Sequence, residues 1–179
     1  MQNRGIFLGL GSNQRGRWRN CAQVLYHAVR RLEQSGFALA AQSRIVASAP
    51  LGRGRQPPYC NMVIAVQCPL GPAALLRHLK RVEGEAGRRT GLRWAPRVLD
   101  IDILDYKGRI LGHPALATRR GTLILPHPGI AERDFVLLPL LEVAPGWRHP
   151  ILGVGARSLL SRRPRRARRI AIVETPAGG

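Results

Sequence analysis

Apolar and polar residues follow two periods along the first part of the chain. Residues 5–11 form a compact apolar run closed by a glycine and two polar residues, which is typical of a buried strand before a turn. From residue 17 to 34 the apolar positions recur every three or four residues, and this spacing predicts an amphipathic helix closed by Gly36. A second strand is expected over residues 37–46.

The same two periods return further along. Strands are predicted over residues 59–68 and 98–104, and between them an amphipathic helix over 72–85. This helix begins with Pro72, at a position where a missing N–H does no harm. The order strand, helix, strand, strand, helix, strand predicts an α+β fold, the ferredoxin-like βαββαβ sandwich, in which an antiparallel sheet carries its helices on one face.

Short C-terminal elements are expected after these, two strands and one helix, at residues 108–111, 122–125 and 133–142. We assign residues 1–155 to one domain and residues 156–179 to an arginine-rich C-terminal tail. Blocks of like charge are usually solvated, so the tail is expected to be disordered or loosely attached, with a nucleic-acid or membrane contact as the alternative. The sequence leaves open whether residues 170–173 dock as a strand.

The net charge of the chain indicates what kind of partner it binds. The 179 residues carry a formal net charge of +19, and because Lys80 and Lys107 are the only lysines, nearly all of the positive charge is arginine. Such a bias can reflect a GC-rich genome, and it bears on association and solubility rather than on fold. The expected partner is a polyanion, with ATP, nucleic acid and an anionic membrane surface as the alternatives.

Cysteine usage indicates a reducing compartment. Cys21, Cys60 and Cys68 are odd in number and lack a CxxC spacing, so they predict neither a disulfide framework nor a zinc site. No apolar run approaches the roughly 18 residues of a membrane span, and no long apolar segment precedes Ser12. We therefore expect a soluble, unprocessed, cytoplasmic protein without a membrane partner.

The strongest chemical signal is a pair of carboxylates in the strand over residues 98–104. Asp100 and Asp102 would point to the same face, about 6.5 to 7 Å apart along the backbone. Two like charges on one face raise each other's pKa unless a cation lies between them. Carboxylate oxygens suit Mg²⁺ shared with substrate phosphates, so we expect a magnesium and nucleotide-phosphate site. The alternative is that the two aspartates form ion pairs with neighbouring arginines. The candidates are Arg88, Arg89, Arg93 and Arg97.

No glycine-rich phosphate loop with its lysine occurs in the sequence, so a phosphate site would depend on arginines and metal. Tyr59 and Asn61 stand at the start of a strand, where a planar ligand could be both stacked and hydrogen-bonded. Phe135 lies in a polar setting that is unlike a core. Taken singly, each has a structural alternative: a half-buried ring for Tyr59, a core residue for Phe135 and a turn residue for His127.

Five blocks of residues, in order, carry a resemblance: Gly9-Leu10-Gly11-Ser12-Asn13, Pro50-Leu51-Gly52 with Gln56-Pro57-Pro58-Tyr59-Cys60-Asn61, the string from Arg93 to Leu104, Leu125-Pro126-His127-Pro128, and the run from Arg133 to Leu140. Together they closely resemble the 6-hydroxymethyl-7,8-dihydropterin pyrophosphokinase family of folate biosynthesis. The string RWAPRVLDIDIL is highly specific, and the first two blocks are moderately so.

The resemblance implies a catalytic domain that transfers pyrophosphate from ATP to the pterin hydroxymethyl group, releases AMP and uses two Mg²⁺. It implies that Asp100 and Asp102 are the metal-bridging carboxylates, with Asp102 considered as a proton acceptor. The further implied roles are catalysis and phosphate binding by Arg88 and Arg97, phosphate binding by Arg133, nucleotide binding by His127 and Glu83, closure over ATP by Trp94, and pterin binding by Tyr59, Phe135, Asn61, Ser48 and Leu51.

The chain departs from the family pattern at a few places: Ala49 stands for a proline, Ala95 for a glycine, and the loop from Arg88 to Trp94 is about one residue shorter. Two alternatives stay open, a nucleic-acid-binding domain of the same fold class and a paralogue that binds pterin without transfer. Against the first, the chain lacks the aromatic cluster that RNA-recognition modules carry on a central strand. We expect a monomer with small-molecule substrates and no stable nucleic-acid partner.

Overall fold

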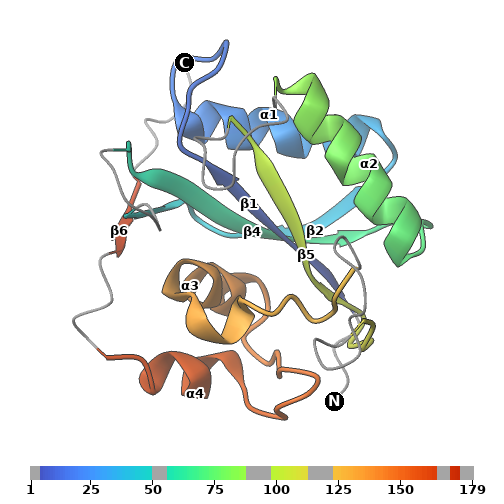
Figure 1. The fold of residues 1–179 in the computed structure, drawn as a ribbon, viewed down its shortest axis with the longest axis vertical. Helices are drawn as coiled ribbons and strands as arrows, with labels where there is room; N and C mark the ends of the chain where they lie inside the picture. Colours follow the sequence, from blue (N-terminus) through green and yellow to red (C-terminus); the bar gives the residue numbers. More distant parts are fainter. Residues whose placement is uncertain (1–4, 50–55, 88–97, 113–122, 165–169, 174–179) are drawn as a thin grey trace.

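The computed structural model describes residues 5–49, 56–87, 98–112, 123–164 and 170–173 (Figure 1). Its elements, in chain order, are β1 (Ile6–Ser12), α1 (Cys21–Gln34), β2 (Ala38–Gln42), β3 (Val46–Ser48), β4 (Tyr59–Gln67), α2 (Pro72–Glu85), β5 (Asp100–Tyr106), the 3₁₀ helix η2 (Ile130–Glu132), α3 (Asp134–Val143), α4 (Ala156–Ser161) and β6 (Ile170–Ile172).

The strands form one sheet with the order β5-β1-β4-β3-β6, in which β2 also pairs with β4 and every pairing is antiparallel. This confirms the ferredoxin-like prediction. The single strand expected over residues 37–46 is instead two strands. Ser43 separates them, because its hydroxyl accepts a hydrogen bond from the Val63 N–H at 3.0 Å where a regular ladder would continue.

Helices α1 and α2 cover one face of the sheet, as predicted, and the C-terminal helices α3 and α4 lie on the other (Figure 1). Alternation along β4 supplies both cores. Met62 and Ile64 are buried with α1 and α2, whereas Val63 and Ala65 are buried with α3 and α4. The central strand is therefore apolar on both faces.

The helix boundaries follow local signals. Helix α2 has the predicted bounds, with Pro72 in its first turn. Helix α1 begins at Cys21 rather than near residue 17, because the Asn20 side chain caps it by accepting a hydrogen bond from the Gln23 N–H at 2.9 Å. The chain leaves α1 through Gly36, whose φ of 85° favours glycine.

The C-terminal residues pack against the domain at two places. Leu159 and Leu160 of α4 are buried in the core under α3, and β6 pairs with β3. The expectation of a loosely attached tail is wrong for α4, whose apolar residues are buried. For residues 170–173, which the sequence left open, the structure shows a strand. The division at residue 155 stays a prediction. Within the described residues, no helix is long and apolar enough to cross a membrane.

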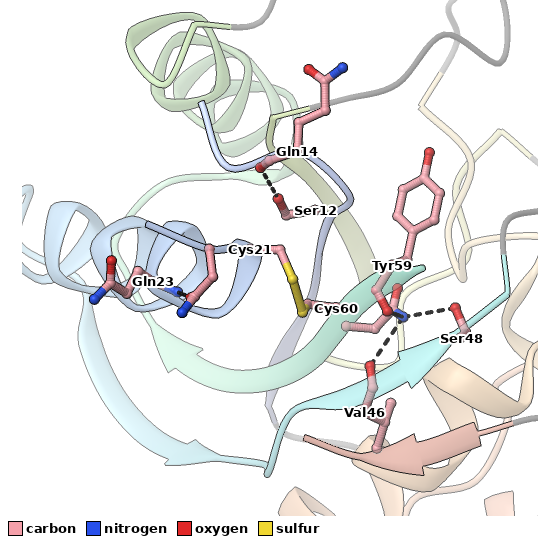
Figure 2. Close-up of a disulfide and its surroundings, with 10 residues drawn as sticks. Ser12, Gln14, Cys21, Gln23, Val46, Ser48, Tyr59 and Cys60 are labelled. Carbon is pink, nitrogen blue, oxygen red and sulfur yellow. Dashed lines mark hydrogen bonds between the residues drawn. A yellow bond between two sulfur atoms is a disulfide. The ribbon is translucent and has the colours of Figure 1, made fainter. Parts of the chain in front are cut away.

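Cys21 and Cys60 form a disulfide between the first turn of α1 and the start of β4 (Figure 2). The prediction that the cysteines form no disulfide is therefore wrong. The two residues are separated by 39 positions, and the fold brings them together because α1 begins close to the end of β1. Ser12, the last residue of β1, pairs with Cys60 in the sheet. Cys68 is the remaining free cysteine.

Candidate active site

Strand β5 presents Asp100 and Asp102 to a cavity, while the residues that alternate with them are buried in the core. The neighbouring strand β1 has glycines at the paired positions: Gly11 opposite Asp100 and Gly9 opposite Asp102. Paired residues in adjacent strands point to the same face of a sheet. Because these two are glycines, no side chain of β1 fills the space beside the carboxylates.

The cavity has a volume of about 350 Å³, within the usual range of small-molecule sites. Most of the residues implicated by the sequence line it: Ser48, Tyr59, Asn61, Asp100, Asp102, His127, Arg133 and Phe135. Four other predicted site residues, Leu51, Arg88, Trp94 and Arg97, lie outside the described residues. The structure therefore brings together the predicted metal, phosphate and pterin residues that it describes, with one exception discussed below.

Gly9 and Gly11 are lining residues to which we assigned no role from the sequence. Their signal was available, because two glycines at alternate positions of a strand clear one face of it. Gly11 pairs with Asp100 on one side and with Asn61 of β4 on the other. A Cβ at Gly11 would lie 3.5 Å from Asn61 Oδ1. These glycines therefore leave an open floor between the carboxylates and Asn61.

The Asn61 side chain is held by backbone carbonyl groups and by Ser48. Its amide Nδ2 donates to Ser48 Oγ at 3.0 Å, and it also lies 3.4 Å from the Val46 carbonyl oxygen and 3.3 Å from the Tyr59 carbonyl oxygen. Since these acceptors occupy the NH₂ group, the amide oxygen is the end directed toward Gly11 and the cavity. A carbonyl oxygen in this position can accept a hydrogen bond from the N–H edge of a planar heterocycle.

Phe135 and Arg133 flank the start of α3 and both line the cavity. The Arg133 guanidinium carbon lies 5.9 Å from the centroid of the Phe135 ring, a cation–π arrangement. Gly129 makes room for the guanidinium, because a Cβ at residue 129 would lie 2.6 Å from Arg133 Nε. The charge and the aromatic face are thus presented together, one suited to phosphate and the other to a flat ring.

His127 faces the carboxylates from the segment before η2. Its Nε2 lies 3.8 Å from Asp102 Oδ2, and its Nδ1 accepts a hydrogen bond from the Gly129 N–H at 3.0 Å. In the neutral ring the proton therefore sits on Nε2, directed toward the cavity. Burial lowers the pKa of His127, against the opposing effect of Asp102. The uncharged ring is thus favoured as a hydrogen-bond donor near Asp102.

Glu83 is the exception among the predicted site residues, because it does not line the cavity. Its side chain is fully buried under β5, where Oε1 accepts hydrogen bonds from the Ile101 N–H at 2.7 Å and from Lys80 Nζ at 2.8 Å. Burial raises the pKa of Glu83, although Lys80 and the Ile101 amide act in the opposite direction. Ile101 stands between Asp100 and Asp102, so Glu83 fixes the backbone that carries them.

The donor set fits Mg²⁺. Among the residues that the structure describes, no cluster of three or more His, Cys, Asp or Glu side chains could hold a metal by itself. Asp100 and Asp102 instead offer two carboxylates beside an open cavity. This fits an ion that takes one or two carboxylates, several waters and substrate phosphates, rather than one that needs a closed protein cage.

The fold and the cavity define a ferredoxin-like protein in which one cavity brings aromatic, acidic and basic side chains together. Residues 7–145 match the family described as 7,8-dihydro-6-hydroxymethylpterin-pyrophosphokinase. This chain belongs to that family. The family and the names of its relatives indicate pyrophosphokinase activity in folate biosynthesis, and the family implies the use of ATP. The family, fold class and activity predicted from the sequence are thereby confirmed.

Relatives include two proteins named 2-amino-4-hydroxy-6-hydroxymethyldihydropteridine pyrophosphokinase. That of Aquifex aeolicus is 36% identical over 146 residues, which cover 82% of this chain and 84% of the relative. That of Pseudomonas aeruginosa is 38% identical over 145 residues, with coverages of 81% and 83%. A folic acid synthesis protein of Dictyostelium discoideum is 35% identical, but the match covers only 21% of its length.

Solved structures with the same fold include larger proteins. A crystal structure of an HPPK-DHPS in complex with substrates gives a TM-score of 0.66 at 16% identity, covering 88% of this chain and 43% of that one. A Plasmodium falciparum HPPK-DHPS with pteroate also gives 0.66, at 14% identity, with coverages of 90% and 45%. This chain thus spans less than half of those two proteins, and the likeness concerns the fold.

Proposed function

We propose that this chain transfers pyrophosphate from ATP to the hydroxymethyl group of 6-hydroxymethyl-7,8-dihydropterin and releases AMP. The observation that carries the proposal is the rung Asp100–Gly11–Asn61 across β5, β1 and β4, which sets a carboxylate and an amide on the open floor of one cavity. The family match over residues 7–145 supports the same reaction.

In this reaction the hydroxymethyl oxygen attacks the β-phosphorus of ATP. The bond between that phosphorus and the oxygen it shares with the α-phosphate breaks, AMP departs with that oxygen, and the hydroxyl proton is lost. We assign acceptance of this proton to Asp102, which has the neutral His127 ring beside it. Positioning and charge neutralisation supply most of the catalysis in such transfers.

Pterin binding is assigned to Asn61, Ser48 and the rings of Tyr59 and Phe135, together with the backbone near Leu51. Phosphate binding is assigned to Arg133 and, outside the described residues, to Arg88 and Arg97, because guanidinium forks match phosphate oxygens. His127 would donate Nε2–H to the nucleotide, and Trp94 would close over ATP. Asp100 and Asp102 would hold two Mg²⁺ ions, whose charge would neutralise the phosphates.

The direct test is AMP formation from ATP, Mg²⁺ and 6-hydroxymethyl-7,8-dihydropterin by the purified chain. Asp100→Ala and Asp102→Ala should each lower turnover by several orders of magnitude, since each removes a metal ligand. Glu33→Ala removes an exposed acidic residue of α1 and serves as the matched control. Absence of AMP above background with the unaltered chain would refute the proposed reaction, and near-normal rates in both aspartate variants would refute the metal assignment.

We further propose that the chain acts as a monomer, with these small molecules rather than a nucleic acid as its partners. The molar mass of the purified chain in solution, measured by light scattering, tests the first part. The mass of one chain is 19.7 kDa, and a measured mass twice as large would show a dimer instead of a monomer. The cytoplasmic location stays a prediction, and the Cys21–Cys60 disulfide removes the cysteine argument for it.

A further inference from the structure

The segment that follows the family match contacts two elements that carry cavity residues, α3 and β3. Arg163, just after α4, contacts the first residue of α3. Residues 170–173 run along the outer edge of β3. We call Arg163 and residues 170–173 the C-terminal brace. Both parts lie beyond residue 145, where the family match ends.

The first contact is an ion pair at a buried carboxylate. Arg163 Nε donates to Asp134 Oδ1 at 3.1 Å, and the Asp134 side chain is only 4% exposed. Asp134 stands between Arg133 and Phe135, both of which line the cavity. A buried carboxylate is strongly disfavoured without a partner. Because Asp134 is the first residue of α3, this ion pair joins Arg163 to the turn that carries Phe135.

The second contact is the pairing of β6 with the edge of β3 that faces away from β4. β3 has three residues, and β6 pairs with all of them, Ser48 opposite Ile170 and Val46 opposite Ile172. The Val173 N–H extends this pairing by donating to the Ile45 carbonyl oxygen at 2.9 Å. A short edge strand would otherwise leave one row of backbone groups without a protein partner. β6 therefore gives β3 a second neighbour besides β4.

β3 matters to the cavity because it holds Asn61. Ser48 Oγ and the Val46 carbonyl oxygen both accept from the Asn61 amide, and both belong to the strand that β6 covers (Figure 2). A shift of β3 would release the NH₂ group of Asn61 and let its amide oxygen turn away from the cavity. Asp100 and Asp102 belong to β5 at the opposite end of the strand order. The carboxylates are therefore remote from the brace.

We propose that the C-terminal brace is a positioning element for the pterin side of the site, acting on Asn61 through β3 and on Phe135 through Asp134. The inference rests on the proposed function, which assigns these two residues to the pterin. Residues outside the family match thus contribute to recognition of the pterin substrate, whereas the metal-binding strand is independent of them.

Two variants test the brace separately. Arg163→Gln removes the ion pair, with Arg162→Gln at the exposed neighbouring residue as the matched control. Ala171→Pro removes a backbone N–H in the middle of β6, with Ala171→Val as the control that keeps it. For each brace variant we expect a rise of about tenfold or more in the dihydropterin KM and Kd, the scale of a lost charge-assisted or ladder hydrogen bond. For Ala171→Pro the ATP KM and the Mg²⁺ dependence should stay near their original values. Arg163→Gln should raise the ATP KM as well, because Arg133 adjoins Asp134 at the start of α3.

The outcomes separate the brace from the proposed function. Dihydropterin affinities of both brace variants equal to those of their controls would overturn the brace. In Ala171→Pro, equal losses of ATP and dihydropterin affinity would also overturn it, because they would show general disruption rather than positioning of Asn61. If Arg163→Gln proves too unstable to purify, Ala171→Pro still decides, because it leaves Asp134 paired. An unaltered chain that binds ATP but no dihydropterin would overturn the proposed function instead.

Discussion

The Glu83 carboxylate accepts a hydrogen bond from the backbone N–H of Ile101 at 2.7 Å, although Glu83 lies in α2 and Ile101 in β5. The bond reaches the strand between its two cavity-facing aspartates. The nucleotide-binding role expected of Glu83 stays a prediction, whereas its observed contact is with the backbone of β5. From this arrangement we infer that Glu83 is a positioning residue for Asp100 and Asp102.

Replacement of Glu83 should therefore affect metal use more than substrate affinity. Glu83→Ala leaves the Ile101 N–H buried without its acceptor, and we expect a loss of about 1–3 kcal/mol in the free energy of unfolding. We also expect a higher Mg²⁺ requirement in the AMP assay. Glu83→Gln keeps an acceptor oxygen at the same place and should recover much of the activity.

Glu85→Ala is the matched control, because Glu85 belongs to the same helix and pairs with Arg31 in an exposed position. Exposed pairs contribute little to stability. Equal Mg²⁺ requirements in Glu83→Ala and Glu85→Ala would show that Glu83 does not act on the metal-binding strand. A titration of activity against Mg²⁺ at saturating ATP makes this comparison.

Gly129 provides a second test, directed at the phosphate side. Its φ of −84° is open to any residue, so Gly129→Ala should be tolerated by the backbone. The added methyl group would meet the Arg133 guanidinium, whose Nε lies 2.6 Å from the Cβ position, and would push it aside. We expect a several-fold rise in the ATP KM with little change in melting temperature.

Gly146→Ala adds the same methyl group at an exposed glycine with no atom within 4 Å of the Cβ position. It should leave both the ATP KM and the melting temperature unchanged. An ATP KM for Gly129→Ala that matches Gly146→Ala would mean that the observed place of Arg133 is not the one used for phosphate.

Where local signals decided the structure, the sequence predicted it closely. The bounds of α2 follow from Pro72 and from the spacing of its apolar residues, which are properties of the segment itself. Asp100 and Asp102 share a face because alternation in a strand needs no knowledge of the partner strand. Tyr59, Asn61 and Phe135 were candidates from their own settings in the sequence, each with a structural alternative, and only the resemblance assigned them to the pterin.

Tertiary contacts account for what was missed. Helical spacing puts Glu83 beside the apolar stripe of α2, four residues after Leu79, but it does not reveal that the carboxylate meets the Ile101 N–H of β5. The Cys21–Cys60 disulfide joins segments that become neighbours only through the sheet. β6 follows an arginine block whose charge indicates solvation, whereas its pairing depends on an open edge at β3. Each of these needs the assembled fold before it can be inferred.

His149 supplies a prediction for the pH dependence of stability. It is 7% exposed, its Nδ1 accepts from the N–H groups of Ile151 and Leu152, and burial lowers its pKa from the usual 6.5. As the pH falls below 6.5, the unfolded chain binds a proton that the folded chain resists. The contribution of His149 to stability is therefore fully present above that pH and is lost as the pH falls toward the folded-state pKa.

His149→Asn keeps an acceptor near Nδ1 and removes the titration. Its free energy of unfolding should fall less between about pH 7.5 and about pH 5.5, the range around the pKa of an ordinary histidine, than that of the unaltered chain. Urea denaturation at several pH values in this range measures the difference. Parallel pH profiles for the two proteins would show that His149 does not contribute to acid destabilisation.

The Cys21–Cys60 disulfide gives the final prediction, because Cys60 stands between Tyr59 and Asn61 in the wall of the cavity. The disulfide closes a loop between residues 39 positions apart, which lowers the conformational entropy of the unfolded chain. This effect stabilises the folded state by at most roughly 4 kcal/mol. Cys21→Ser should therefore lower the melting temperature, and a reductant should lower that of the unaltered chain but not that of the variant.

Cys68→Ser, at the free cysteine, should keep the response to reductant. Titration of thiols in the unfolded, unreduced protein should find one. Three thiols, with melting temperatures indifferent to reductant, would mean that the bond does not form in the purified protein.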